Sequence, residues 1–414
     1  MSSLTGNAGA APRHDVRVIS LIGIGHFFSH FYILVLPPLF PLLRGELGVS
    51  YTALGFALAV LNLVTALTQA PIGFLVDRFG ARYILVAGLA IFALATGLIG
   101  VFPSYSALVL LMALAGLGNS VFHPADYSIL SASVNPERMG RAFSIHTFGG
   151  YFGFAAAPVV IVFLTQLFGW RAALMASGAV GLVVALVLLA NREVLNGDTG
   201  PAQARTPDRR ARGGGDLRLL LSAPILMALA FFVMLALAHG GITSFGVSAL
   251  VALYDISLVD ANVPLSAYLF ASAFGVLAGG IAADRTHRHD LVVGACVVLI
   301  ALSIAPLGAV TPGPAMVIAA FTIAGFFSGA VAPSRDMMVR AITPKGASGK
   351  VFGFVTTGFN IGGVITPLVF GAILDLAQPK LVFWLVAIVS LATILTIVGA
   401  GRPARARDAA GPPD

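Results

Sequence analysis

Charged residues are scarce in this sequence. Only 10% of its 414 residues are Asp, Glu, Lys or Arg, and 58% are hydrophobic, whereas soluble domains carry roughly 25% charged residues. The single cysteine, Cys296, excludes an intramolecular disulfide and a multi-cysteine metal site. No Gly-x-x-x-x-Gly-Lys-Ser/Thr loop occurs, which excludes ATP hydrolysis by that route. These absences argue against an ordinary soluble domain and against a nucleotide-driven machine.

Long apolar runs take the place of the missing charge. Runs of about 20 apolar residues are typical of membrane helices, in which glycine and proline are tolerated. The sequence therefore predicts an all-α polytopic membrane protein with twelve transmembrane helices. Their approximate ranges are 16–43, 51–76, 83–102, 105–132, 142–165, 171–191, 219–245, 264–283, 291–310, 315–339, 351–375 and 381–400.

An internal repeat relates the two halves of the chain. Gly73-Phe-Leu-Val-Asp-Arg recurs as Gly280-Ile-Ala-Ala-Asp-Arg, and at a spacing of 209 residues Pro124 recurs as Pro333 and His30 as His239. Such a repeat in an apolar chain predicts two pseudo-symmetric six-helix bundles with the substrate between them. The predicted domains are 1–191 and 219–401, joined by a polar cytoplasmic linker at 192–218 and followed by a tail at 402–414.

Basic residues are distributed unevenly between the predicted loops. With a cytoplasmic N-terminus, 20 of the 24 Lys and Arg residues fall on the cytoplasmic side, three (Arg44, Arg171 and Lys380) fall opposite, and Arg335 lies within a helix. Because basic loops resist translocation, both termini are expected in the cytoplasm. The net charge of +7 thus reflects topology rather than nucleic-acid binding. No cleavable signal peptide is evident, and the expected location is a bacterial-type inner membrane.

Gly73-Phe-Leu-Val-Asp77-Arg78-Phe-Gly80-Ala-Arg82 resembles the loop 2–3 signature of the major facilitator superfamily, from which only Ala81 departs. Phe122-His123-Pro124-Ala125 resembles the fosmidomycin-resistance-like group of bacterial exporters within that superfamily. The resemblance implies the major facilitator fold and transport by alternating access. The Gly-rich, Pro-containing segment 149–158 loosely matches the family's antiporter motif. The arginine that antiporters often carry in helix 4 is absent, so their proton relay is not carried over.

The repeated loops are candidates for a cytoplasmic gate. A carboxylate at the end of helix 2 or helix 8 can accept hydrogen bonds from the N-terminus of a nearby helix, and an arginine can pair with it. By resemblance, Asp77 and Arg82 latch the outward-facing state, and the second, degraded copy is expected to latch more weakly. The alternative is that these residues are ordinary topogenic loop charges. The gate residues are Gly73, Asp77, Arg78, Gly80, Arg82, Gly280, Asp284 and Arg285.

Few ionisable side chains fall within the predicted helices, and such residues are functional candidates because an unpaired charge in hydrocarbon is costly. The resemblance places helices 1, 4, 7 and 10 around a central cavity, and most of these residues fall on them. The predicted substrate and proton cavity comprises His26, His30, Tyr32, Asn119, His123, Asp126, His146, Tyr151, His239, Arg335, Asp336 and Asn360.

Asp126 and Arg335 are repeat equivalents of opposite charge. They are expected either to form an inter-half salt bridge that breaks when Asp126 is protonated, or to be satisfied locally, with Asp336 or the backbone pairing with Arg335.

The histidines can have either a functional or a structural role. Histidine titrates near neutral pH, which suits a proton carrier or a substrate contact, but each could equally be a neutral side chain bonded to a helix carbonyl or hydroxyl. His26 and His30 are spaced as a two-ligand metal pair, but no carboxylate accompanies them in their own helix, and no metal or other cofactor is expected.

The sequence favours a proton-coupled secondary transporter that exports a small organic molecule or drug. Proton-coupled uptake of a small organic anion, with Arg335 and the histidines as counter-charges, is the alternative. The polar residues in both halves argue against a non-transporting receptor or scaffold, and the lack of a nucleophile–base spacing or metal motif argues against a membrane enzyme. The expected partners are a small-molecule substrate, protons and the lipid bilayer, without nucleic acid, and a monomer is expected.

Overall fold

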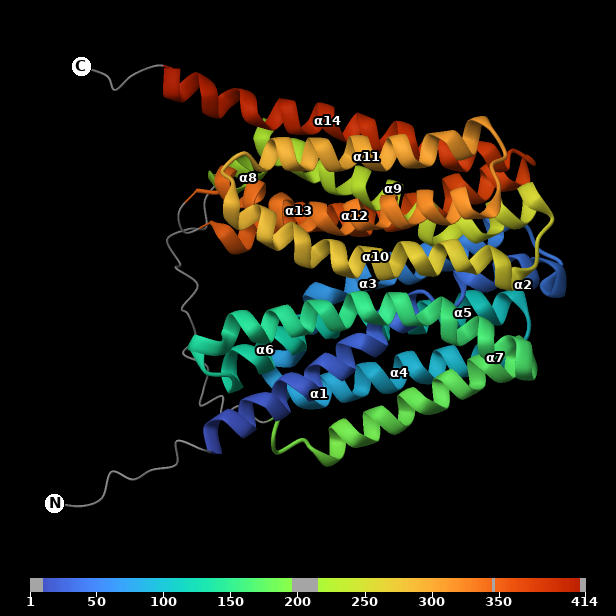
Figure 1. The fold of residues 1–414 in the computed structure, drawn as a ribbon. Helices are drawn as coiled ribbons and strands as arrows, with labels where there is room; N and C mark the ends of the chain where they lie inside the picture. Colours follow the sequence, from blue (N-terminus) through green and yellow to red (C-terminus); the bar gives the residue numbers. More distant parts are fainter. Residues whose placement is uncertain (1–9, 196–214, 345–346, 410–414) are drawn as a thin grey trace, which may run out of the picture. The chain divides into compact units, whose positions relative to one another are not determined.

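A computed structural model describes residues 10–195, 215–344 and 347–409 of the chain, so most of the predicted linker and the end of the predicted tail lie outside the described residues. The described residues are mostly helical, with short turns between the helices, and contain no strand. Figure 1 shows the helices running roughly alongside one another within each half of the chain. The helices of the first half are α1 (Ala10–Ile33), η1 (Pro37–Leu39), α2 (Phe40–Leu47), α3 (Tyr51–Phe79), α4 (Ala81–Val101), α5 (Tyr105–Asn119), α6 (Phe122–Ser133), η2 (Pro136–Arg138) and α7 (Met139–Ala190).

The described part of the second half contains one short helix and six long ones. They are α8 (Gly215–Leu220), α9 (Ala223–Tyr254), α10 (Leu258–Arg285), α11 (His289–Ala309), α12 (Pro314–Ile342), α13 (Ser348–Asp375) and α14 (Pro379–Ala409).

Eleven stretches of the described chain are long and apolar enough to cross a membrane. One of them, Pro136–Ala190, has 55 residues, more than twice the length needed for one crossing. Its helix α7 is kinked at Gly169, where φ is 79°, a left-handed value that glycine adopts without strain. The kink separates the two predicted helices 142–165 and 171–191, and all twelve predicted spans are thereby accounted for.

Prolines interrupt two of the predicted helices. The span 16–43 ends as a regular helix at Ile33 and continues as η1 and α2 after Pro37 and Pro38. The span 105–132 is divided into α5 and α6 just before Pro124, which lacks an amide hydrogen and crowds the preceding turn.

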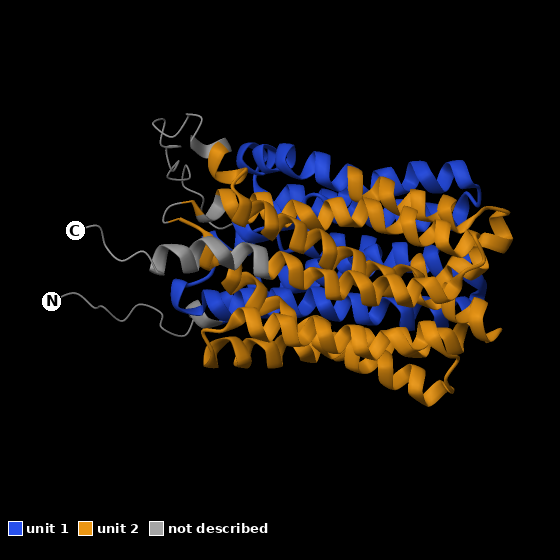
Figure 2. Ribbon diagram, turned by 90° about the horizontal axis from the view of Figure 1, so that it is seen from above, with its two compact units in different colours: residues 1–35, 64–206 blue, residues 36–63, 207–414 orange. Residues whose placement is uncertain are grey.

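The chain forms two compact units, shown in blue and orange in Figure 2. Unit 1 comprises residues 1–35 and 64–206, and unit 2 comprises residues 36–63 and 207–414. The boundary falls within α3, whose first residues belong to unit 2 and whose remainder belongs to unit 1. The repeat places residues 36–63 in the first bundle, whereas the contacts in this structure group them with the second half.

Glycines allow close helix packing within each unit. In unit 1, a Cβ added at Gly153 of α7 would lie 2.2 Å from the carbonyl oxygen of Phe27 in α1. In unit 2, a Cβ at Gly329 of α12 would lie 1.9 Å from the carbonyl oxygen of Ser272 in α10. Membrane helices lack a strong hydrophobic drive to associate, so close backbone approach of this kind supplies the van der Waals contact that holds them together.

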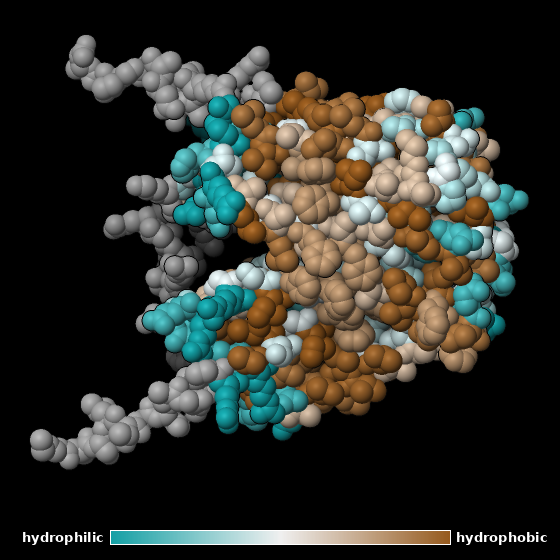
Figure 3. Space-filling model, viewed as in Figure 1, coloured by the Kyte–Doolittle hydropathy of each residue, from teal (hydrophilic) through white to brown (hydrophobic). Residues whose placement is uncertain are grey.

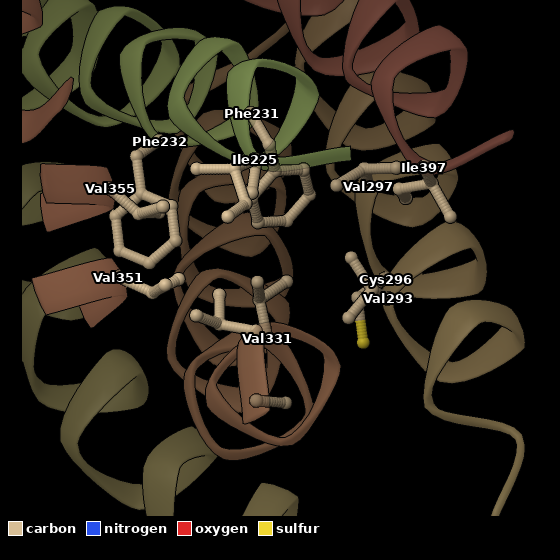
Figure 4. Close-up of a cluster of buried hydrophobic side chains, with 13 residues drawn as sticks. Ile225, Phe231, Phe232, Val293, Cys296, Val297, Val331, Val351, Val355 and Ile397 are labelled. Atoms are coloured by element: carbon tan, nitrogen blue, oxygen red, sulfur yellow. The ribbon is translucent and has the colours of Figure 1, made fainter. Parts of the chain in front are cut away.

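Hydrophobic side chains are found on both the outside and the inside of the helices. Phe74, Leu110 and Leu395 are each more than 70% exposed, and Figure 3 shows brown hydrophobic side chains along the helix flanks and teal hydrophilic side chains near helix ends. Figure 4 shows part of the buried core of unit 2, in which Phe231 and Phe232 of α9 pack with residues of α11, α12 and α13. Exposed apolar flanks around a packed core are expected of helices in lipid.

Candidate functional site

A buried carboxylate lies at the centre of the candidate site in unit 1. Asp126 of α6 is completely buried. Its Oδ2 atom lies 3.1 Å from Nδ1 of His26 in α1 and 2.9 Å from Nε2 of His146 in α7. Both histidines are also buried. Three helices of one unit thus bring together three ionisable side chains that are far apart in the sequence.

Two further histidines surround this trio. The ring of His26 stacks on that of His146 with 3.6 Å between centroids, and it lies 4.5 Å from the ring of His30 and 5.6 Å from that of His123. Gly150 of α7 makes room for the group, because a Cβ there would lie 2.9 Å from Nε2 of His26 and 3.0 Å from Nε2 of His30. We call His26, His30, His123, Asp126 and His146 the His–Asp cluster. The structure brings all five of these predicted site residues together.

The His–Asp cluster contains two buried polar atoms without a partner among the described residues, Oδ1 of Asp126 and Nδ1 of His30. A buried acceptor or donor left unpaired costs free energy, so such atoms in a native structure need an explanation. Imidazoles and a carboxylate that share hydrogen bonds can take up and release a proton, and the hydrogen-bond pattern depends on which group carries it. The arrangement is therefore chemically suited to proton exchange.

The same atoms are compatible with a metal ion. His26, Asp126 and His146 each offer a ligand atom, and these atoms all lie within 4.8 Å of one another. Two imidazoles and one carboxylate are a common ligand set for divalent transition metals. The spacing in the sequence indicated only His26 and His30 as a possible pair of metal ligands. The structure instead supplies the carboxylate from α6, which spacing within one helix could not reveal.

His239, the repeat equivalent of His30, has a different environment in unit 2. Its Nδ1 atom lies 3.0 Å from the hydroxyl oxygen of Tyr268 in α10, and that hydroxyl group lies 2.9 Å from the hydroxyl oxygen of Ser328 in α12. No carboxylate pairs with it among the described residues. This geometry matches a histidine bonded to a hydroxyl group, which is the structural alternative considered for it above.

Arg335 pairs with its neighbour in sequence. Its Nε atom donates a hydrogen bond to Oδ1 of Asp336 at 2.8 Å, and its guanidinium lies 4.9 Å and 5.2 Å from the ring centroids of Phe232 and Phe359. Asp126 is bonded to histidines of its own unit. In this structure each member of the proposed inter-half pair is therefore satisfied locally.

The remaining predicted cavity residues are placed outside the His–Asp cluster. Tyr32 is buried and donates to the carbonyl oxygen of Ser177 at 2.8 Å, which is a bond between α1 and α7. Asn119 of α5 donates to the hydroxyl oxygen of Thr65 in α3 at 3.3 Å. Tyr151 and Asn360 lie half-buried in α7 and α13. These four residues contribute to helix packing or lie elsewhere in their units.

The first gate loop has a pairing that the sequence did not indicate. Gly80 adopts a φ of 88° between α3 and α4, so the glycine of the signature is required by the turn. Arg82 donates to the carbonyl oxygen of Arg192 at 3.1 Å and lies 3.7 Å from Glu193. Asp77 is exposed and has no ion pair among the described residues. The predicted Asp77–Arg82 pair is thus absent from this conformation, in which Arg82 binds the end of α7 instead.

In the second gate loop, Gly280, Asp284 and Arg285 lie at the end of α10. The ion pair in this loop joins Arg288 to Asp290 at 3.5 Å. Both loops lie at helix ends, as predicted, and a latch formed by either of them remains a prediction.

Sequence reasoning overlooked Asp375, at the end of α13. Its carboxylate accepts hydrogen bonds from the backbone amides of Tyr51 and Thr52 at 2.8 Å each, and from the Thr52 hydroxyl at 2.6 Å. The repeat gave no signal, because its equivalent is Gln166. A carboxylate capping a helix N-terminus was predicted for Asp77, and the structure contains that arrangement at the opposite end of α3.

Comparisons with known proteins agree with this architecture. The sequence profile of the Major Facilitator Superfamily matches residues 22–263 and again residues 234–413. The chain is similar to the nucleoside transporter NupG, with a TM-score of 0.76 and 14% identity, covering 92% of this chain and 99% of the other. It is also similar to a bacterial homologue of the lysosomal transporter Spinster in an inward-facing, occupied conformation, with a TM-score of 0.73 and 16% identity, covering 95% and 96%.

Two curated relatives have informative names. The Fosmidomycin resistance protein of Escherichia coli (strain K12) is 26% identical over 409 residues, which cover 94% of this chain and 95% of the relative. The probable galactarate/D-glucarate transporter GudP of Bacillus subtilis (strain 168) is 23% identical, covering 80% and 79%. With the repeated helical bundles and the profile matches, these similarities show that the chain is a multi-pass membrane transporter, not an enzyme, and that it belongs to the major facilitator superfamily, in its fosmidomycin-resistance-like group.

Proposed function

We propose that this transporter exports a small organic molecule or drug by alternating access and that proton movement through the His–Asp cluster drives the export. The single observation that carries the proposal is the buried carboxylate of Asp126 between two imidazoles, at 3.1 Å and 2.9 Å. The sequence has no Gly-x-x-x-x-Gly-Lys-Ser/Thr loop for ATP hydrolysis, so an ion gradient is the proposed energy source for uphill transport.

A proton is the ion that this cluster suits best. Asp126 and its two bonded histidines supply one carboxylate and two imidazoles whose protonation changes the net charge of a water-poor site. Because an isolated charge is costly there, gain or loss of one proton changes the relative stability of conformations that hydrate the site differently. This is the physical basis on which proton binding couples to alternating access.

Export is favoured over uptake by the relative that the chain matches almost end to end, which is named for fosmidomycin resistance. We therefore choose fosmidomycin as the first probe substrate. The proposed location is the bacterial inner membrane with both termini in the cytoplasm, supported by the uneven distribution of basic residues, and the proposed working unit is a monomer.

Uptake of a small organic anion is the second candidate. It is favoured by relatives named as sugar-acid transporters and by Arg335, which lies between two phenylalanine rings and is only partly exposed. If uptake is the function, Arg335 would exchange its pairing with Asp336 for pairing with the anionic substrate. The gate loops would serve the same alternating-access cycle.

Drug accumulation in cells tests the proposal. An Escherichia coli strain lacking its own fosmidomycin resistance protein would express the wild type, Asp126→Asn or Asp255→Asn. Asp255 is an exposed residue at the end of α9 with φ 49°, which asparagine tolerates, so it is a matched control. Export predicts that the wild type and the control lower cell-associated drug and that a protonophore raises it again. If the protonophore lowers the drug content of expressing cells, uptake is the function.

A further inference from the structure

The buried carboxylate of Asp126 has no permanently charged partner. It pairs with His26 and His146, whose imidazoles are charged only when they are protonated. Among the described residues, no arginine or lysine lies within ion-pair distance of it. A buried anion that is not offset by a cation is costly. The site therefore requires a cation, which is either a proton on the trio or a metal ion.

The second oxygen of this carboxylate is a ligand atom that the protein leaves unused. Oδ1 of Asp126 is buried and has no hydrogen-bond partner within the described part of the chain. A proton on this oxygen would create a donor that has no acceptor. Carboxylates bind metal ions through one or both oxygens, so an ion held by Oδ2 could also be bound by Oδ1. A metal ion thus accounts for the unpaired atom, whereas a proton on Oδ1 does not.

The three candidate ligand atoms are spaced as a tetrahedral site requires. Zinc bonds to imidazole nitrogen and carboxylate oxygen are about 2.0–2.2 Å long, which places neighbouring ligand atoms roughly 3.3 Å apart. Oδ2 of Asp126 lies 3.1 Å from Nδ1 of His26 and 2.9 Å from Nε2 of His146, and no two of the three atoms are more than 4.8 Å apart. Small side-chain rotations therefore admit an ion. Three protein ligands leave the fourth position to water or another small ligand.

Close packing of α1 against α7 fixes the backbone around this site. A Cβ added at Gly149 would lie 3.0 Å from the carbonyl oxygen of Gly23, and one added at Gly153 would lie 2.2 Å from that of Phe27. In α1 these two contacts lie on either side of His26 in the sequence. Ligands on tightly packed helices are held more precisely than ligands on loops. The site is thus largely preorganised.

The ligand set indicates the class of ion. Imidazole suits zinc and the neighbouring first-row transition metals, whereas Mg²⁺ and Ca²⁺ are bound mainly by oxygen atoms. Two imidazoles and one carboxylate therefore favour a divalent transition-metal ion over Mg²⁺ or Ca²⁺.

An exposed histidine lies beside the site. His123 is exposed, and its ring centroid lies 5.6 Å from that of His26. Tyr127 is 46% exposed, and its ring centroid lies 5.5 Å from that of His146. The buried trio is thus separated from exposed side chains by a single layer, and an ion can reach it without unfolding of the unit.

We propose that His26, Asp126 and His146 form a binding site for one divalent transition-metal ion of the zinc class. The ligand atoms are Nδ1, Oδ2 and Nε2, in that order. The proposed coupling proton uses the same side chains, but binding of the metal ion requires neither a substrate nor a proton gradient. The two proposals can therefore fail separately.

Cobalt binding by the purified full-length protein tests the site. Co²⁺ is the probe, because it absorbs visible light strongly in a four-coordinate site and weakly in water. The protein is purified through a tag without histidine and is freed of metal with a chelator. We expect one Co²⁺ to bind per chain with a strong visible band. Zn²⁺ should displace it, because such sites prefer zinc to cobalt, and excess Mg²⁺ should not.

Ligand variants locate the bound ion. His26→Gln and Asp126→Asn should each weaken Co²⁺ binding at least about 100-fold, since loss of an outer-shell partner alone costs 10–100-fold. His239→Gln is the matched control, because it removes a half-buried histidine of unit 2 that is bonded to Tyr268, and it should leave the affinity unchanged. Size exclusion and the melting temperature without metal check that each variant is folded.

X-ray absorption by the zinc-loaded wild type provides a test that requires no variant. We expect two imidazole nitrogens and at least one oxygen around the ion. Oxygen ligands alone would mean an adventitious ion only and would overturn the proposal.

Other results would also overturn it. These are the absence of stoichiometric Co²⁺ binding, displacement by Mg²⁺ as readily as by Zn²⁺, or equal affinity in folded Asp126→Asn and the wild type. If the ion binds as expected while vesicles carry no proton-driven flux, the metal site stands and the proposed coupling fails.

Discussion

Nε2 of His146 and Nδ1 of His26 lie 2.9 Å and 3.1 Å from the same oxygen of Asp126. One carboxylate oxygen thus links α1, α6 and α7, while its other oxygen has no partner among the described residues. Protonation of any member of the trio changes which bonds can form. A local change of charge is thereby transmitted to three helices of unit 1.

Replacing the carboxylate should uncouple transport from protons. Asp126→Asn keeps the size of the side chain but cannot carry the same charge. We expect proton-driven export to fall at least roughly tenfold, because bonds to a charged group contribute about 1.5–3 kcal/mol. Membrane levels and the melting temperature of the purified protein serve as controls. Full export by Asp126→Asn at wild-type levels would remove Asp126 from the mechanism.

Histidines of the two units should respond differently when replaced. His146→Gln removes an imidazole bonded to Asp126, whereas His239→Gln removes one bonded to the Tyr268 hydroxyl group. We expect His146→Gln to abolish the pH dependence of initial export rates and His239→Gln to keep it. Equal loss in both variants would assign His239 a coupling role that its hydrogen bonds do not indicate.

Charge reversal between the halves tests the inter-half pair. Arg335 pairs with Asp336 at 2.8 Å, and Asp126 pairs with histidines. The double variant Asp126→Arg with Arg335→Asp is therefore expected to transport no better than either single variant in the same cells. Restored export in the double variant would instead support a direct bridge in another conformation of the cycle.

Close helix packing makes a prediction about stability. A Cβ at Gly153 would lie 2.2 Å from a backbone oxygen of α1, whereas nothing lies within 4 Å of one at Gly140 in the same helix. Gly153→Ala should lower the free energy of unfolding by about 1–3 kcal/mol, and Gly140→Ala should not lower it. Thermal unfolding of the purified variants in detergent provides the comparison, and equal melting temperatures would contradict it.

The fold was predictable because its signals are repeated along the sequence. The length of the apolar runs predicted the twelve spans, and the recurrence of residues such as Pro124 and Pro333 predicted the two halves. The grouping of residues 36–63 with unit 2 was not predictable, because the repeat assigns them to the first half and the grouping depends on contacts in the folded chain.

The candidate site was predictable in its membership but not in its pairing. Intramembrane charge singled out Asp126 and the histidines of helices 1, 4 and 5. It could not show that Asp126 bonds to His26 and His146, because those bonds span 100 and 20 residues of chain. Asp375 was not singled out as a candidate residue, because it lies at the end of its helix, where charged residues are common.

Drug uptake by inside-out membrane vesicles tests the central claim most directly. Such vesicles reverse the cell, so a proton-coupled exporter should accumulate labelled fosmidomycin when their interior is made acidic. The account predicts accumulation by the wild type and Asp255→Asn, its abolition by a protonophore, and none by Asp126→Asn. Proton-dependent accumulation in right-side-out vesicles alone, or accumulation by Asp126→Asn equal to that of the wild type, would contradict it.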